Sequence, residues 1–510
     1  MPRVAIATTS SLAADGARDV IDRGGNAVDA ALAAALVTMN TEPGVCALAG
    51  GAFITVWAPG EAPVTCDGYV TVPGLGTDRL ARDDAALDVT MAYGGGITTT
   101  IGPASVAVPG TLAAVDTVME RYGTLGLATA LEPSIAAARD GFPLSQACHY
   151  YLQYSGKSVF GRNPVSLRAL HPDGDTLLPA GGIVHLPGLA DSLQAIADNG
   201  AREFYEGELA RTIVDHVAAG GGVLTREDMA RFEAVLRPAL QVELGDWQIA
   251  LNPPPAIGGT MLGALLLATA NDTPLLDALR TALQYRRGAL DFADALEPAC
   301  QALIDQARTD GLLTAVRGSA NTVHTSAVDS NGLACAVTAS SGYGSGEMPA
   351  GTGLWLNNCL GELELNRRGL DAGPPGSRLP SNMAPTAARR GGDALAIGSP
   401  GADRITSALA QVLTRFVLEG EPLQQAIDAP RFHVEAGLTR EAGESRFPER
   451  LFTEPGALDV VSDIEAQHTF DGPSMYFGGA GGALFDATGD TLTAAADPRR
   501  TGATAVAGTD

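Results

Sequence analysis

The 510-residue sequence contains very little lysine and few aromatic side chains. Lys157 is the single lysine, so the other basic residues are arginines, and the net charge is −25. A chain this acidic repels nucleic acid phosphates and anionic lipid surfaces, so we expect no nucleic acid or membrane partner. A dispersed acidic surface with scarce lysine suits solubility in a salty cytoplasm, but GC-rich coding, which replaces lysine by arginine, explains the composition at least as well. Neither explanation indicates which reaction the protein catalyses.

Paired cysteines, metal-ligand clusters and long apolar runs are also missing. The six cysteines are scattered without a CxxC pair, which argues against a zinc ribbon or a disulfide framework and predicts single buried thiols. No second histidine or carboxylate stands at ligand spacing, so we expect neither a metal nor a cofactor. The N-terminus lacks the features of a secretory signal and no apolar stretch reaches membrane-spanning length, so we expect a cytoplasmic protein.

Alanine and glycine dominate what is present, and hydrophobic residues make up 45% of the chain. This composition predicts a large core of closely packed elements with small side chains. Helical patterns are predicted over residues 111–122 and over 133–139, where Pro133 suits a first helical turn. Most recognisable strands lie in the C-terminal third. Mixed strands and helices indicate an α/β layered fold, and a four-layer αββα sandwich is compatible with the pattern.

One β-hairpin stands out about two-thirds of the way along the chain. Residues 322–328 and 333–338 alternate as strands do, and they flank an Asp-Ser-Asn-Gly turn at 329–332. The preceding residues 307–321 are small and polar without periodicity, which predicts an exposed, cleavable connector. If the chain were cut before Thr322, that residue would carry both a hydroxyl nucleophile and a free amine.

Short motifs in a fixed order surround this hairpin. They are Gly24–Ala31 (GGNAVDAA), Glu42-Pro43 before Gly50-Gly51, Ser105–Gly110 (SVAVPG), Phe204–Gly207 (FYEG), Gly221–Thr225 (GGVLT), Pro253–Pro255 with Gly258-Gly259, Leu356–Asn358 (LNN), Pro380–Thr386 (PSNMAPT), Gly398–Gly401 (GSPG), Ala429–Arg431 (APR) and Asp497–Arg499 (DPR). Each motif is weak alone, but the ordered set, which spans nearly the whole chain, resembles the γ-glutamyltranspeptidase family of N-terminal nucleophile hydrolases.

The resemblance implies a self-cleaving precursor with an αββα fold. The cut would fall between Asn321 and Thr322 and would give a large subunit, 1–321, and a small subunit, 322–510, which remain in one αββα unit. The new α-amine of Thr322 would serve as general base for its own Oγ, because its reference pKa of about 8 leaves a neutral fraction at working pH. The acyl group of a small-molecule amide would transfer to Thr322, and water or an amine acceptor would release it.

The resemblance also places supporting residues around the nucleophile. The backbone N–H groups of Gly401 and Ala402 would stabilise the oxyanion. Ser340 occupies the position of a second hydroxyl that bonds the nucleophile. His324 lies two residues after Thr322 on the same predicted strand, and we interpret it as structural, because the α-amine already supplies the base.

The substrate side departs from the family pattern. Ser381 and Asn382 match a Ser-Ser pair that holds the substrate carboxylate, and Glu362 lies near the acidic position that binds the α-amine. Within residues 67–73, however, Tyr69 stands where the family has an arginine that clamps the γ-glutamyl α-carboxylate. A phenol cannot replace a bidentate charged clamp at equal strength.

The leading hypothesis is therefore a threonine amidohydrolase or acyltransferase that cleaves γ-glutamyl amides such as glutathione through an acyl-Thr322 intermediate, in glutathione metabolism. Two alternatives stay open. The same mechanism could act on another small amide, such as an oxamate-like substrate or the acyl side chain of a β-lactam, because Tyr69 replaces the arginine. The chain could instead be an uncleaved, non-enzymatic paralogue.

Overall fold

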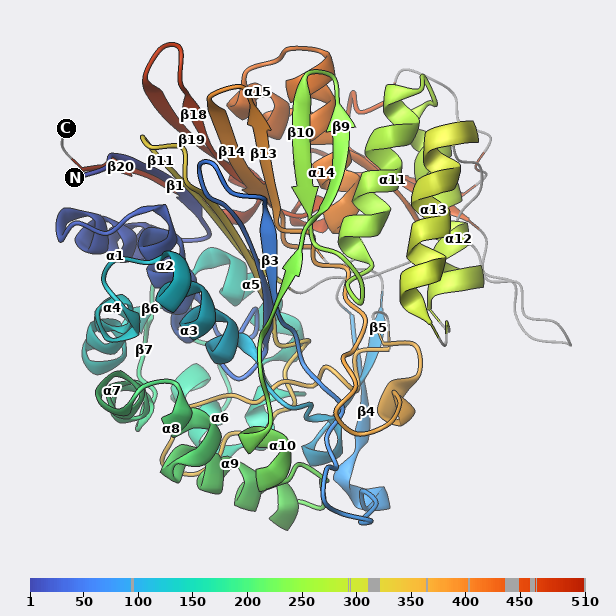
Figure 1. Cartoon of the computed structure of the whole chain (residues 1–510). Coiled ribbons are helices and arrows are strands. Elements are labelled where there is room, and N and C mark those ends of the chain that lie inside the picture. Colours follow the sequence, from blue (N-terminus) through green and yellow to red (C-terminus); the bar gives the residue numbers. More distant parts are fainter. Residues whose placement is uncertain are drawn as a thin grey trace, which may run out of the picture.

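The computed structural model describes residues 1–510 except 93–95, 292, 294, 311–321, 364–365, 402–403, 436–448, 459–463, 465 and 509–510. Two β-sheets lie face to face at its centre, and helices cover the outer face of each sheet (Figure 1). This is the four-layer αββα arrangement that the sequence suggested.

The first sheet has seven strands, and strands from the N-terminal part of the chain lie next to strands from its C-terminal part. Across the sheet the strands are β20 (Ala503–Ala507), β1 (Val4–Thr8), β11 (Val323–Asp329), β12 (Ala334–Ser340), β2 (Gly51–Trp57), β3 (Val64–Gly68) and β8 (Val235–Pro238). All of these pairs are antiparallel. The predicted hairpin is thus β11–β12, and it lies in the middle of the sheet.

The second sheet has six antiparallel strands and packs against the first. In order they are β19 (Thr491–Ala496), β18 (Gly481–Asp486), β14 (Asp393–Gly398), β13 (Thr386–Arg390), β10 (Trp247–Leu251) and β9 (Leu240–Leu244). Small side chains fill the space between the sheets, among them Ala5, Ala250, Ala336, Ala396 and Ala483. Such side chains let the two sheets approach closely, as the alanine-rich composition predicted.

Helices of two separate groups form the outer layers. On the outer face of the first sheet lie α1 (Ser11–Asp22), α2 (Ala27–Thr41) and α3 (Thr111–Tyr122), and α4 (Leu127–Asp140) packs on α2. On the second sheet, α11 (Gly258–Ala270) contacts β9 and β10, and α12 (Leu275–Tyr285), α13 (Leu296–Asp310) and α14 (Arg404–Leu413) pack on α11. The chain has further helices: α5 (Gln146–Ser155) and, below the first group in Figure 1, α6 (Pro164–Leu170), α7 (Leu189–Asn199), α8 (Arg202–Glu206), α9 (Glu208–Ala219) and α10 (Arg226–Ala230).

Two predicted boundaries prove wrong. The helix predicted over 133–139 begins at Leu127, so Pro133 lies in its interior, where its ring packs on Gly16 of α1. The predicted connector 307–321 is helical at its start, because α13 continues to Asp310 and buries Ala307 completely. In both places tertiary packing overrides the local signal. The remainder of the connector, 311–321, lies outside the described residues.

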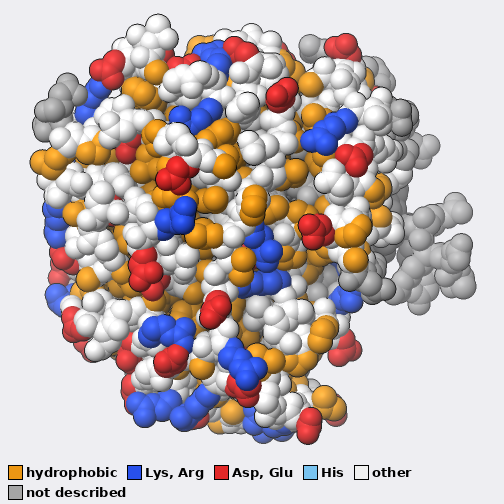
Figure 2. Space-filling model, viewed as in Figure 1, with side chains coloured by type: hydrophobic (Ala, Val, Ile, Leu, Met, Phe, Trp, Pro, Cys, Tyr) orange, Lys and Arg blue, Asp and Glu red, His pale blue; other side chains and the backbone are white. Residues whose placement is uncertain are grey.

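All six cysteines are buried and unpaired, as predicted. In the described part of the chain, no helix combines the length and the apolar character needed to cross a membrane. Charged side chains of both signs are interspersed over the face shown in Figure 2 rather than gathered in one patch.

Candidate active site

Thr322 lies at the start of β11, next to the central strand of the seven-stranded sheet. It immediately precedes β11 and is 1% exposed. Val323 pairs with Ala339 of β12, so the same register carried one residue further sets Ser340 opposite Thr322. Ser340 is also buried, and it ends β12. The structure therefore places the predicted nucleophile and the predicted second hydroxyl on neighbouring strand ends.

A close approach of β2 to Tyr69 links this strand end to the position where the family has its carboxylate-clamping arginine. Ser340 pairs with Gly51 at the start of β2. A Cβ atom on Gly51 would lie 2.6 Å from Cδ2 of Tyr69, so only glycine leaves space for the phenol ring. The ring also stacks on Phe53, with centroids 5.7 Å apart. The Gly-Gly motif at 50–51 thus has a packing role: it lets Tyr69 lie beside the strand that carries Ser340.

The hydroxyl of Tyr69 lies among polar groups from two other segments. It lies near the thiol of Cys359 and the hydroxyl of Ser381, and Glu362 is close enough to interact electrostatically. All four side chains are at least 98% buried. Burial, together with Cys359 and Glu362, raises the pKa of Tyr69 well above its ordinary value. The phenol therefore stays protonated and can act as a neutral hydrogen-bond donor.

The turn after β12 connects Ser340 to the acidic residue. The Gly342 N–H donates to the Ser340 hydroxyl at 3.2 Å. The position of a Cβ on Gly342 would be 3.2 Å from Oε2 of Glu362 and 2.3 Å from Oδ1 of Asn358. Asn358 Oδ1 in turn accepts from the N–H of Tyr343 at 2.7 Å. The turn, Glu362 and Tyr69 thus form one continuous polar wall that starts beside Thr322, the predicted nucleophile.

Arg378 does not restore the missing carboxylate clamp. Its guanidinium donates to the backbone carbonyls of Tyr69 and Glu233, lies 3.8 Å from a carboxylate oxygen of Asp67, and stacks over the Phe232 ring at 4.5 Å. These contacts hold the arginine behind the backbone of Tyr69 rather than at its hydroxyl.

His324 fixes the loop from the second sheet over the start of β11. Its Nδ1 lies 2.8 Å from the Thr338 hydroxyl and its Nε2 lies 2.6 Å from the Ser326 hydroxyl. A Cβ on Gly398, the last residue of β14, would come within 2.2 Å of the imidazole. Desolvation lowers the pKa of His324 to about 3, so the ring is neutral. This arrangement agrees with the structural interpretation of His324.

Gly401 lies three residues after Gly398, and its φ of +130° favours glycine. Its carbonyl accepts from the N–H of Arg404 at 2.9 Å, and its α-carbon packs against the backbone of Gly478. Ala402, the second predicted oxyanion donor, and Asn321, on the other side of the predicted cut, lie outside the described residues.

Asn382 is buried beside Ser381 at the start of α11. The carbonyl of Ser381 accepts from the N–H groups of Ile257 and Gly258, and the backbone of Asn382 packs directly on Gly258. The Pro-Pro-Pro and Gly-Gly motifs at 253–259 therefore support the segment that carries Ser381.

One residue beside Tyr69, Cys359, was not predicted from the sequence. Cys359 follows Leu356–Asn358, but in the sequence it looks like any of the six buried thiols. Its contact with Tyr69 joins segments 290 residues apart in the sequence, and a single sequence contains no signal for that contact.

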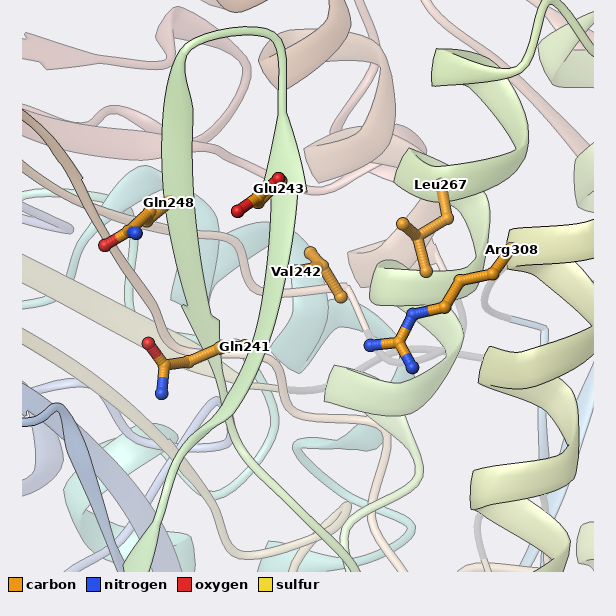
Figure 3. A pocket seen from close by; sticks show the side chains of 6 residues that line it. All are labelled: Gln241, Val242, Glu243, Gln248, Leu267 and Arg308. Atoms are coloured by element: carbon orange, nitrogen blue, oxygen red, sulfur yellow. The ribbon is translucent and has the colours of Figure 1, made fainter.

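A separate hollow of about 290 Å³ lies between the β9–β10 hairpin and helices α11 and α13. Its lining, shown in Figure 3, is Gln241, Val242, Glu243, Gln248, Leu267 and Arg308. None of the predicted site residues takes part in it. Among the described residues, no group of three or more histidine, cysteine or acidic side chains could hold a metal ion.

Comparison with known proteins identifies the family. The family model of γ-glutamyltranspeptidase matches residues 13–507. The chain belongs to the γ-glutamyltranspeptidase family. Within that family the chain is 27% identical to the glutathione hydrolase proenzyme of Escherichia coli (84% of this chain, 80% of that protein). It is also 27% identical to the acylase ACY 1 proenzyme of Pseudomonas sp. strain V22 (85% and 83%) and to scoloptoxin SSD14 of Scolopendra dehaani (98% and 91%).

The fold is shared with solved structures of the same kind. The crystal structure of cephalosporin acylase from Bacillus halodurans superposes with a TM-score of 0.79, covering 99% of this chain and 96% of that one at 22% identity. The predicted N-terminal nucleophile hydrolase fold is therefore confirmed. The relatives include both glutathione hydrolases and acylases. Family membership therefore indicates a hydrolase of this family, but it does not identify the acyl group of the substrate.

Proposed function

We propose that the chain is a self-cleaving threonine amidohydrolase with Thr322 as its nucleophile. The observation that carries the proposal is the convergence of Thr322, Ser340, Gly342, Glu362 and Tyr69 in one buried polar wall at the centre of the fold. Relatives described as proenzymes support the cut before Thr322.

In the proposed reaction, the α-amine of Thr322 takes the proton from Oγ as Oγ attacks the amide carbonyl. The N–H of Gly401 donates to the oxyanion. The C–N bond then breaks, the proton passes to the leaving amine, and an ester joins the acyl group to Thr322. Water, or an amine acceptor, attacks this ester and restores the free hydroxyl.

For the acyl group, the residues around Tyr69 favour a substrate without the γ-glutamyl α-carboxylate. Tyr69 offers a neutral donor where the resemblance predicts an arginine, and Arg378 is held by backbone carbonyls and Asp67. A buried carboxylate without a cationic partner is costly. An acyl group without a carboxylate, such as an uncharged acyl side chain of a β-lactam, suits these residues better, and an oxamate-like substrate, whose acyl group keeps a carboxylate, suits them less well. γ-Glutamyl amides such as glutathione remain the reference substrate for the test.

The mechanism is tested by intact mass and a denaturing gel. The purified chain should separate into fragments 1–321 and 322–510, and Thr322→Ala should leave a single 52.1 kDa chain. Cleavage that persists in Thr322→Ala would assign the cut to another residue or to a protease. A wild-type chain that stays whole would favour the non-enzymatic alternative.

The acyl group is tested on the cleaved enzyme with γ-glutamyl-p-nitroanilide, oxamate and glutaryl amides, whose acyl groups carry a carboxylate, and with phenylacetyl-p-nitroanilide, whose acyl group is uncharged. We expect the highest turnover with the uncharged acyl group and weak turnover of γ-glutamyl-p-nitroanilide. Efficient hydrolysis of γ-glutamyl-p-nitroanilide alone would reverse this choice while leaving the nucleophile unchanged.

A further inference from the structure

A second pocket, of about 460 Å³, opens next to the loop that carries Gly401. Its volume lies in the range of small-molecule sites. Six of its lining residues have aromatic rings: Tyr150, Tyr154, Phe452, His468, Phe470 and Tyr476. In a chain with only 5% Phe, Trp and Tyr, such a concentration marks a site for a flat, apolar ligand.

The rings on one wall of this aromatic pocket hold one another in place. The Phe452 and Tyr476 centroids are 4.7 Å apart, and Phe470 lies 5.4 Å from Tyr476. His468 meets Phe470 edge to face at 4.7 Å. His468 is exposed and Phe470 is half-buried, so both present surface to the pocket. Because these rings are already ordered by mutual packing, a ligand that stacks on them has little side-chain entropy to remove.

The aromatic pocket also contains a cation. Arg450 is the lining residue with a permanent charge, and its side chain is 39% exposed. Glu435, behind the wall, accepts from Arg450 at 2.6 Å and from the Tyr476 hydroxyl at 2.8 Å, which orients both. In a protein with a net charge of −25, this guanidinium favours a ligand that carries an anionic group.

The wall of the aromatic pocket continues into the proposed oxyanion loop. The carbonyl of Tyr476 accepts from Nε of Arg404 at 3.1 Å, and the N–H of Arg404 donates to Gly401 at 2.9 Å. Gly478, two residues after Tyr476, packs on the α-carbon side of Gly401. The residues around Tyr69 belong to other segments, and none of them lines the aromatic pocket.

We propose that the aromatic pocket binds the amine portion of the amide substrate, and that this portion carries a planar aromatic ring with an anionic group. The proposal rests on the amidohydrolase function above. It adds the half of the substrate that leaves, which neither the family membership nor the residues around Tyr69 specify.

Binding is measured first, without catalysis. The full-length Thr322→Ala chain is titrated calorimetrically with 2-naphthoate, and with 2-naphthol as the neutral analogue. We expect one saturable site for 2-naphthoate. Phe470→Ala should weaken both ligands at least tenfold, and Arg450→Gln should weaken 2-naphthoate at least tenfold while changing 2-naphthol less than twofold. Tyr122→Ala, which removes a half-buried ring far from this pocket in the sequence and outside its lining, is the matched control and should change neither.

The assignment to the amine portion is measured next on the cleaved wild-type enzyme. With one acyl group held constant, amides of 4-aminobenzoate should have a KM at least tenfold below amides of aliphatic 4-aminobutanoate. Phe470→Ala should remove this difference by raising KM for the aryl amide, with kcat changed little. Absence of saturable 2-naphthoate binding, or equal binding by the Phe470→Ala variant, would overturn the proposal. An unchanged KM ratio in Phe470→Ala would overturn the assignment to the amine portion.

Failure of the amidohydrolase function gives a different result. In that case no amide is hydrolysed and the wild-type chain stays whole, whereas the 2-naphthoate titration and its Phe470 and Arg450 dependence are unaffected.

Discussion

At the residue scale, Tyr69 is the position where the chain departs from the family pattern. The predicted catalytic residues fit that pattern, whereas this predicted substrate-binding residue does not. Its backbone is held by Arg378 and its ring by Phe53, while its hydroxyl contacts Cys359 and Ser381. The position that would clamp a charged carboxylate thus presents a phenol that cannot supply charge.

Replacement of Tyr69 by arginine should move specificity towards γ-glutamyl substrates. Tyr69→Arg is expected to raise kcat/KM for γ-glutamyl-p-nitroanilide about tenfold or more, because a charge-assisted hydrogen bond contributes roughly 1.5–3 kcal/mol. Steady-state kinetics of the cleaved variant measure this. Tyr69→Phe, which keeps the ring and removes the hydroxyl, is the matched control and should give no gain. A folded, cleaved Tyr69→Arg enzyme without improved γ-glutamyl turnover would contradict the role given to this position.

The sequence predicted part of this site. The resemblance carried by the ordered motifs pointed to Thr322, Ser340, Glu362 and Ser381 as site residues, and the structure brings these segments close to one another. Their roles stay predictions. Cys359 was not predicted, because its significance depends on the hydroxyl of Tyr69, which lies 290 residues away in the sequence.

At the scale of elements, the contact between β11 and β14 positions the Gly401 loop. The His324 ring on β11 packs directly against Gly398 on β14. A larger side chain at either position would therefore push the two sheets apart. Sequence patterns predicted both strands but not their contact, because periodicity reports which face is buried and not what covers it.

Gly398→Ala should destabilise the fold by about 1–3 kcal/mol or more, because the new methyl group would overlap the His324 ring in a closely packed layer. Thermal unfolding measures the change. Gly472→Ala is the control, since a Cβ there meets nothing within 4 Å and its φ is not positive. Equal melting temperatures for the two variants would contradict the described packing.

His324 should make stability depend on pH. Its pKa falls from 6.5 to about 3 on burial, so between these values the unfolded chain binds a proton that the folded chain does not. Stability therefore falls as the pH falls from about 6.5 towards 3, by up to about 1.4 kcal/mol per pH unit.

The measurement compares wild type with His324→Gln by denaturant unfolding between pH 7 and 4. The difference between the two proteins removes contributions from other groups, including Glu42, whose raised pKa of about 7 acts in the opposite direction. The variant should show the shallower loss of stability on acidification. Parallel curves would show that His324 does not titrate on unfolding in this range.

At the scale of the whole molecule, the predicted subunits are interleaved in one sheet. Strands β11 and β12 follow the predicted cut, yet they lie between β1 and β2, which precede it. β20, from the end of the chain, pairs with β1. The layered class was predictable from the mixture of helices and strands, but this strand order was not, because it depends on pairings between residues hundreds of positions apart.

The cleaved fragments should therefore stay together. We expect 1–321 and 322–510 to co-elute on size exclusion at the mass of the intact chain and to separate only in denaturant, because separation would break backbone pairing on both sides of the β11–β12 hairpin. The uncleaved Thr322→Ala chain is the size reference. Two peaks under native conditions would contradict the interleaved arrangement.

The pairing of β1 with β20 brings the beginning and end of the chain side by side (Figure 1). Chain ends that lie together can be joined by a short linker and new ends opened elsewhere. A circular permutant opened between Asn321 and Thr322 would be synthesised with threonine first, once its initiator methionine is removed. Such a protein would have the nucleophilic amine without any self-cleavage, so maturation and hydrolysis could be measured as two independent reactions.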